Sequence, residues 1–414
     1  MLAALLISWS LFPVLASATT TKVFVIIMLF FRKPEGRVIS GARAFLAISL
    51  ILSLILISRS LLQDNPVWEP RGLPYPLTAV IVAALAVWRG RVSGSFDLAL
   101  LMKLAVVMCW TVLVLAMVFS MFADALPAWL PGTGPQRSVL FTGNALLLAT
   151  VIVLPTVLSA WAGTYFNTRW KWAGYSGVFA GVFVLAGLTQ TRGPLLTVFI
   201  LALAHLVFQL VVYREGKSWL KHALLVTLSM VAAVLLVDLL SSTGIASSMP
   251  WSGSGRMTTV SDQSASLRLL MWKGGFRAIQ EAPLWGYGIQ NRFEAALPYM
   301  DFPEGLRLSH LHNTIVTTWV AGGLFAVISV FALLLLPVWT AVSRGLFFTN
   351  AGQFALLSSL SFLLIGTTNV ILFNDFSIFW TSFTILIALI ALTAADAEAS
   401  GVSEPSTSSK PVGC

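Results

Sequence analysis

Long apolar runs, separated by short charged loops, restrict the possible folds of this chain more than any other feature. Many of them reach the length of a helix that crosses a bilayer, about 17–25 residues. A membrane β-barrel would instead show segments of about ten residues in which apolar and polar positions alternate. Charged residues make up only 10% of the 414 residues, whereas they make up about a quarter of a soluble domain. The sequence therefore predicts an all-α, polytopic helical membrane protein.

The apolar runs predict about twelve transmembrane helices. Residues 1–240 would hold helices 1–9, residues 241–312 one large loop with helices of its own, and residues 313–395 helices 10–12. The tail at 396–414 is rich in Ser, Pro and Gly and is predicted to be disordered. The expected spans are 2–16, 18–31, 42–62, 74–88, 97–121, 139–160, 173–190, 194–213, 220–240, 313–336, 352–372 and 375–395. The first two are short, so residues 2–31 form either two spans or one kinked span.

Every second short loop is basic, which assigns those loops to the cytoplasm by the positive-inside rule. The basic loops contain Arg32, Lys33, Arg37, Arg43, Arg89, Arg91, Arg169, Lys171, Arg214, Lys217, Lys221 and Arg344. Both termini would then be cytoplasmic, and the 241–312 loop would lie on the opposite, outer side. The net charge of +9 is spread over loops rather than gathered in one patch, which argues against nucleic-acid binding.

The sequence Gly-Leu-Thr-Gln-Thr-Arg-Gly-Pro at 187–194 joins two expected spans with almost no loop. Gly193 suits the left-handed residue that follows a helix, and Pro194 suits the first turn of the next helix. Arg192 would then lie at the outer membrane surface, where it could bind an anionic headgroup. A plainer role competes with this one, because an arginine here can also cap the preceding helix or extend to the interface.

Residues 266–283 are predicted to form a helix outside the membrane. On a helical wheel, Arg268 shares an apolar face with Met271, Trp272, Gly275, Ile279 and Ala282, and the opposite, solvated face holds Lys273, Arg277 and Glu281. An unpaired charge is costly to bury. Arg268 is therefore predicted to face a buried anion, the alternative being that it reaches solvent from the first turn of the helix.

His312 comes directly before an expected span, with Asn313 or Ser309 as the expected N-cap. The positive helix end and nearby arginines both disfavour imidazolium, so His312 should be neutral and able to act as a general base. A capping or interfacial histidine is the alternative. His310 should face differently and is the weaker candidate. Asp375, between the last two spans, could orient the histidine or position an acceptor, or it could cap the final helix.

No cluster of carboxylates or histidines has the spacing of a Mg²⁺ or Zn²⁺ site, so no metal is expected. No nucleotide-binding loop is visible, and no other cofactor is expected either. If the substrate is a phosphate ester, arginines must neutralise it, and the energy of the reaction must come with the substrate.

Three motifs together resemble the O-antigen ligase/O-antigen polymerase superfamily of bacterial inner-membrane glycosyltransferases. The motifs are Thr191-Arg192-Gly193, the block Arg268-x3-Trp272 with Pro283-x2-Gly286-x-Gly288, and His312-Asn313 followed by Gly322-Gly323. Their order and spacing are more specific than any one of them. The resemblance covers residues 187–324 closely and the rest of the chain by its expected topology, with one large periplasmic loop.

The resemblance implies transfer of a glycan from undecaprenyl diphosphate to an acceptor in the membrane, without metal or nucleotide. In the ligase branch, the acceptor is a sugar hydroxyl of the lipid A–core oligosaccharide. Arg192 and Arg268 would bind the diphosphate, and His312 would deprotonate or orient the acceptor hydroxyl for direct, inverting displacement. Asp375 is similar to a late acidic residue of the ligases. Substrate contacts are further expected from Asn313 and His310.

Two other functions compete with a ligase. An O-antigen polymerase performs the same chemistry with a second lipid-linked glycan as acceptor, but the single long loop of this chain favours the ligase. A lipid-linked oligosaccharide flippase or other transporter would carry charged residues near the midplane of several helices. The main one here is Lys103, which lies close enough to the cytoplasmic end of its span to reach the interface.

Overall fold

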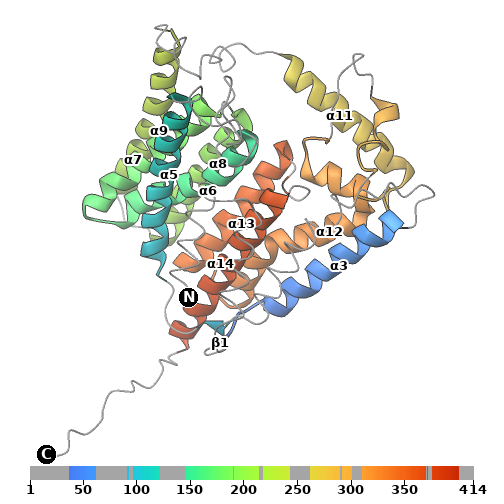
Figure 1. Ribbon diagram of the computed structural model, residues 1–414. Coiled ribbons are helices and arrows are strands. Elements are labelled where there is room, and N and C mark those ends of the chain that lie inside the picture. Colours follow the sequence, from blue (N-terminus) through green and yellow to red (C-terminus); the bar gives the residue numbers. More distant parts are fainter. Residues whose placement is uncertain are drawn as a thin grey trace, which may run out of the picture.

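The computed structural model describes residues 37–61, 91–92, 97–121, 145–189, 191–213, 218–242, 262–289, 291–300, 310–369, 371 and 375–400. Over these residues the protein is an all-α membrane protein, and nine of its helices are long and apolar enough to cross a bilayer (Figure 1). They are α3 (Ala42–Leu61), α5 (Leu98–Met121), α6 (Ala145–Tyr165), α7 (Arg169–Phe183) with its π-helical extension η3 (Val184–Leu188), α8 (Arg192–Tyr213), α9 (Ser218–Ser242), α12 (Thr314–Ser343), α13 (Asn350–Thr368) and α14 (Asp375–Ala399). The remaining elements are α11 (Asp262–Glu281), the 3-10 helix η5 (Leu297–Tyr299), and the strands β1 (Arg37–Val38) and β2 (Arg91–Val92).

The all-α, polytopic fold predicted from the apolar runs is confirmed. The expected spans at 2–16, 18–31 and 74–88 lie outside the described residues. The span expected at 139–160 continues beyond its predicted end, because α6 ends at Tyr165. The disordered tail expected from residue 396 was placed too early, since α14 continues to Ala399.

One end of the helix bundle gathers several of the basic loops. The strands β1 and β2 pair antiparallel there, with Arg37 opposite Val92 and Val38 opposite Arg91. Arg344, just after α12, forms an ion pair of 3.0 Å with Asp396 near the end of α14. These three loops were expected to share one side of the membrane, and they do share one end of the bundle. At the opposite end of the bundle, α8, α12 and α14 begin and α13 ends.

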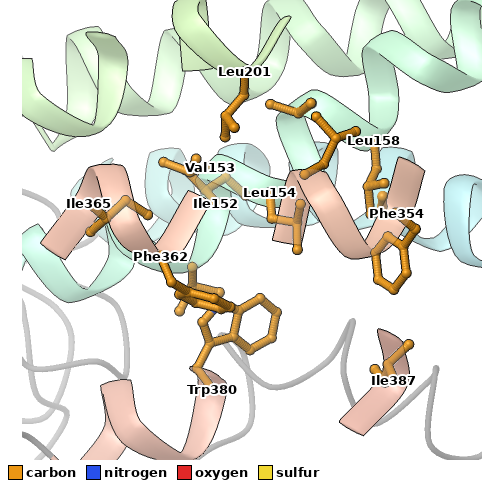
Figure 2. Packing of buried hydrophobic residues seen from close by; sticks show 14 of the residues in the cluster. Ile152, Val153, Leu154, Leu158, Leu201, Phe354, Phe362, Ile365, Trp380 and Ile387 are labelled. Carbon is orange, nitrogen blue, oxygen red and sulfur yellow. The ribbon is translucent and has the colours of Figure 1, made fainter. Parts of the chain in front are cut away.

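The buried centre of the bundle is formed by α6, which packs against α5, α7, α8, α13 and α14. Figure 2 shows its Leu154 among side chains of the neighbouring helices, with Phe362 of α13 beside Trp380 of α14. Close approach of α6 and α7 depends on small residues, because a Cβ at Gly177 would lie 2.8 Å from Oγ of Ser159. Tight packing of this kind holds membrane helices together where no hydrophobic effect acts between them.

Helix α12 is broken near its middle and is not the single regular span expected at 313–336. Gly323 has a left-handed backbone, with φ 67°. The break leaves backbone groups of α12 without helical partners, and the turn at residues 283–288 supplies them. The pairs are the Tyr287 N–H with the Val320 carbonyl (2.7 Å), the Gly288 N–H with the Ala321 carbonyl (2.8 Å) and the Leu324 N–H with the Pro283 carbonyl (2.9 Å). Residues 283–288 are called the docked turn below.

Two glycines allow this docking. A Cβ at Gly323 would collide with the carbonyl of Leu284, and a Cβ at Gly286 would lie 2.6 Å from the carbonyl oxygen of Val320. Both glycines also have positive φ, which other residues adopt only with strain. The glycines of the docked turn and the Gly322-Gly323 pair are therefore two halves of one contact.

Candidate functional site

Helix α11 packs its apolar face on the first turns of α12. Met271, Gly275 and Ile279 are buried, whereas Lys273 and Arg277 are exposed, so the predicted division of the helix into two faces is confirmed. The helix runs from Asp262 to Glu281 rather than over 266–283. The close contact again requires a glycine, because a Cβ at Gly275 would lie 2.5 Å from Cγ1 of Val316.

Arg268 lies on this packed face and is half-buried. Burial lowers the pKa of its guanidinium, but an arginine stays protonated inside proteins. The next turn of α11 is fixed to the segment before α12, because the Trp272 Nε1–H donates to the Leu311 carbonyl at 3.1 Å. Arg268 thereby acts on His312, whose pKa its positive charge lowers. The structure thus brings together two of the residues that were selected from the sequence.

His312 is a neutral, half-buried imidazole. Burial, then His310, then Arg268 lower its pKa to about 4. Its Nδ1 atom is buried and has no hydrogen-bond partner among the residues that the structure describes. The expected neutral state is confirmed, but its main cause is burial rather than the helix end or an arginine. The backbone of His312 is left-handed, with φ 49°, a conformation that is rare for residues other than glycine and costly to maintain.

His310 was expected to face away from His312, and this expectation is wrong. The centroids of the two imidazole rings lie 4.0 Å apart, with 48° between the ring planes. The left-handed backbone of His312, with φ 49°, is neither helix nor strand, so the spacing of the two residues in the sequence does not decide which way their rings face. Burial and the charge of Arg292 lower the pKa of His310, so the pair consists of two neutral rings near neutral pH.

Arg292 was missed by the sequence reasoning. Its guanidinium is largely buried, which lowers its pKa, and Glu294 opposes this shift. One of its terminal nitrogens donates to the carbonyl of Ile289. Arg292 lies in a turn rather than a regular helix, so a helical wheel could not predict that its side chain is buried. The available signal was its position between Ile289 and Phe293, two apolar residues that are both buried.

Asn313 is the N-cap of α12, because its side-chain oxygen accepts from the Val316 N–H at 3.0 Å. The sequence predicted either Asn313 or Ser309 as this cap, and Ser309 lies outside the described residues. The side-chain nitrogen of Asn313 donates to the carbonyl of Thr367 at 3.2 Å, near the end of α13. The beginning of α12 is therefore fixed to the end of α13.

Arg192 is the first residue of α8 and is exposed. Gly193 is not among the glycines with positive φ, so the left-handed role predicted for it is wrong. The chain instead enters α8 from the π-helix η3, and Gly193 provides space, because its Cβ would lie 2.5 Å from Oγ1 of Thr368. Arg192 and Asn313 thus flank the same end of α13.

Asp375 is the first residue of α14 and so lies at the helix start where a capping role was predicted. Its side chain lies outside the described part, so its expected part in orienting the histidine stays a prediction. In the part of the chain that the structure describes, no three His, Cys, Asp or Glu side chains come together as a metal site would require. The described site consists of guanidinium groups, imidazoles and helix N-termini.

The fold and the site together define a multi-pass helical membrane protein with cations and neutral imidazoles gathered where two of its helices begin. The family model described as O-antigen ligase matches residues 177–331, from within α7 into α12. The matched stretch contains Arg192, Arg268, the docked turn and His312. Over these residues the chain is similar to proteins of the O-antigen ligase/polymerase superfamily. No curated protein matches the chain.

Proposed function

We propose that this protein is a lipopolysaccharide O-antigen ligase of the bacterial inner membrane. It transfers an O-antigen glycan from undecaprenyl diphosphate to a sugar hydroxyl of the lipid A–core, on the periplasmic side, with both termini in the cytoplasm. The observation that carries the proposal is the half-buried cation Arg268, which acts on the neutral imidazole of His312 at the start of α12. Its place within the matched family region supports the same assignment.

The arginines of the site would bind the diphosphate of the donor. A diphosphate leaving group keeps the electron pair of the broken bond between the anomeric carbon and oxygen, and it must be stabilised as negative charge develops on it. Arg268 and Arg192 supply guanidinium groups that fit phosphate oxygens. The N-terminus of α8, where Arg192 lies, adds backbone N–H groups and the positive end of a helix dipole.

His312 would take up the proton of the acceptor hydroxyl. The acceptor hydroxyl attacks the anomeric carbon from the face opposite the diphosphate, which inverts the configuration, and its proton passes to the imidazole. A neutral imidazole can take up this proton, whereas imidazolium cannot. The buried Nδ1 atom, which no described residue satisfies, is a nitrogen to which an acceptor hydroxyl can donate. Asp375 and Asn313 belong to the same end of the bundle and would position the acceptor.

The lipid chain of the donor has a candidate location. A groove of about 480 Å³ between α3 and α12 is lined by Ile48, Ile51, Ile55, Trp285, Phe325, Ile328, Ser329 and Ala332. The hydroxyl of Ser329 donates to its own helix, at the Phe325 carbonyl, so the lining is apolar apart from the indole N–H of Trp285. The groove begins at Phe325 of α12, just after the break at Gly323 and twelve residues after the N-cap Asn313, a separation that a polyprenyl chain can span.

The transporter alternative has less support. Among the described residues, no Asp, Glu, Lys or Arg side chain is fully buried, although charged residues inside helices mark a transport pathway. Lys103 lies over the rings of Phe166 and Trp170, 5.5 Å from each centroid, which is a cation–π contact at the basic end. The polymerase alternative shares the site and differs only in its acceptor.

The test is transfer in proteoliposomes that hold purified protein, undecaprenyl-diphosphate-linked O-antigen and lipid A–core, followed by gel separation of capped lipopolysaccharide. We expect His312→Ala and Arg268→Ala to abolish capping, whereas Arg277→Ala, on the exposed face of the same helix, retains it. Normal capping by both site variants would refute the proposal. In cells, polymerised glycan that persists on the lipid carrier when capping is lost identifies a ligase, and its disappearance identifies a polymerase.

A further inference from the structure

Besides its connection to α11 and its hydrogen bonds with α12, the docked turn is bound by a side chain of α3. Arg59, in the last turn of α3, reaches the turn with its side chain, and both Nε and a terminal nitrogen donate to the carbonyl of Gly286, at 3.1 and 2.9 Å. An arginine at a helix C-terminus commonly binds the carbonyls of its own last turn. Here two donors of one guanidinium meet on a single carbonyl of a segment far away in the sequence.

We infer that Arg59 is a positioning residue for transfer: it holds the docked turn in the break of α12 and thereby keeps α11, with Arg268, against the start of α12. The inference rests on the proposed function for its effect on activity. Its effect on the docked turn stands independently of that function.

The geometry explains how an effect at Arg59 reaches the site. Helix α11 ends at Glu281, and the docked turn follows after one residue, so movement of the turn moves the end of α11. The turn is bound to α12 by backbone hydrogen bonds on one side and to α3 by Arg59 on the other. Because α3 itself packs along α12 (Figure 1), the three segments form a closed clamp.

A second contact strengthens the clamp without replacing Arg59. The ring of Trp285 packs on Phe325 of α12, with centroids 5.2 Å apart. This contact fixes the turn to α12 but not to α3. Loss of Arg59 is therefore expected to loosen the turn rather than to unfold the protein, and site groups lose much of their effect when they are displaced by about 1 Å.

The first experiment does not depend on activity. Ile289, directly after the docked turn, is buried with 2% of its surface exposed, so Ile289→Cys is a reporter of docking in a background of Cys109→Ala and Cys414→Ser. We expect Arg59→Met to raise the rate of maleimide labelling of this cysteine by roughly tenfold, through more frequent local opening. The labelling rate in Arg59→Lys should lie between that of Arg59→Met and that of the unsubstituted arginine, since lysine can bind the carbonyl with one donor. Arg277→Met should not change the labelling rate. Equal labelling rates with and without Arg59 would overturn the inference.

The second experiment measures transfer by the same variants. We expect Arg59→Met to lower kcat by roughly tenfold and to change KM by less than about twofold, with partial recovery in Arg59→Lys. If Arg59 acts through Arg268, the double variant Arg59→Met/Arg268→Lys should be no less active than Arg268→Lys alone, which keeps a positive charge and measurable transfer. Full additivity of the two losses overturns the inference. Absence of transfer even from the unsubstituted protein contradicts the proposed function instead, and the labelling rates still decide the role of Arg59.

Discussion

The low pKa of His312 makes a strong prediction about how activity depends on pH. A general base must be deprotonated, so activity falls as the pH falls through its pKa. Because burial and the neighbouring His310 and Arg268 lower this pKa from 6.5 to about 4, the fall should occur near pH 4. At pH 5.5, an unperturbed histidine would be about nine-tenths protonated, whereas His312 would be almost wholly neutral. The structure therefore predicts a roughly tenfold higher rate at pH 5.5 than an ordinary histidine would allow.

The assay is the pH dependence of kcat/KM in proteoliposomes, since this ratio reports on the free enzyme. The acid limb of kcat should lie at higher pH than that of kcat/KM, because the bound diphosphate anion favours imidazolium. His310→Gln removes one cause of the lowered pKa and should move the acid limb of kcat/KM upward, but not as far as pH 6.5, because burial is the largest cause. Because maleimide reacts with the thiolate, whose fraction falls with pH, the control is the labelling rate of Ile289→Cys relative to that of a free thiol. The same ratio at pH 5 as at pH 7 would show that the fold is retained. An acid limb of kcat/KM centred near pH 6.5 in the unsubstituted protein would refute the assignment of His312 as a buried base.

Three further predictions concern the break of α12, the groove and the helix cap. Gly323→Ala places a Cβ against the Leu284 carbonyl at a positive φ, so it should undock the turn, raise labelling of Ile289→Cys and abolish transfer. Ile328→Trp partly fills the groove and should raise KM for the polyprenyl donor several-fold, whereas a tryptophan at Leu335, on the same helix but outside the groove lining, should not; equal KM values would exclude the groove. Asn313→Ala removes the cap of α12 and should cost about 1 kcal/mol of stability, seen as a lower midpoint in thermal denaturation, whereas Asn313→Ser, which keeps a capping oxygen, should retain most of it.

The sequence predicted the features that depend on composition and on regular helices. Apolar runs of bilayer length report directly on membrane helices, because a backbone in lipid must satisfy its own hydrogen bonds. The wheel placed Arg268 correctly because residues 262–281 do form a regular helix. Asn313 could be recognised as a cap because capping depends on residues that are neighbours in sequence.

The errors occur where the backbone departs from regular geometry. His310 and His312 were expected to face differently, but their ring centroids lie 4.0 Å apart beside the left-handed backbone of His312. Glycine often follows the end of a helix, yet Gly193 instead provides the space that Thr368 occupies. Such choices depend on tertiary contacts, and a single sequence carries no direct signal for them.

The break in α12 was the least predictable feature, and it has the largest consequence for the site. A membrane helix can be interrupted only where protein satisfies the freed backbone groups, and residues more than thirty positions earlier in the chain satisfy them here. Undocking would leave the carbonyls of Val320 and Ala321 unpaired, so the C-terminal end of α11 is anchored and does not swing as a free lid. Arg268 lies near the other end of that helix, where Trp272 binds the segment of His312 directly. If the protein is the proposed ligase, its two lipid-linked substrates must therefore reach the site from the sides of α11 rather than by removal of that helix, with Arg268 and His312 held in place throughout the reaction.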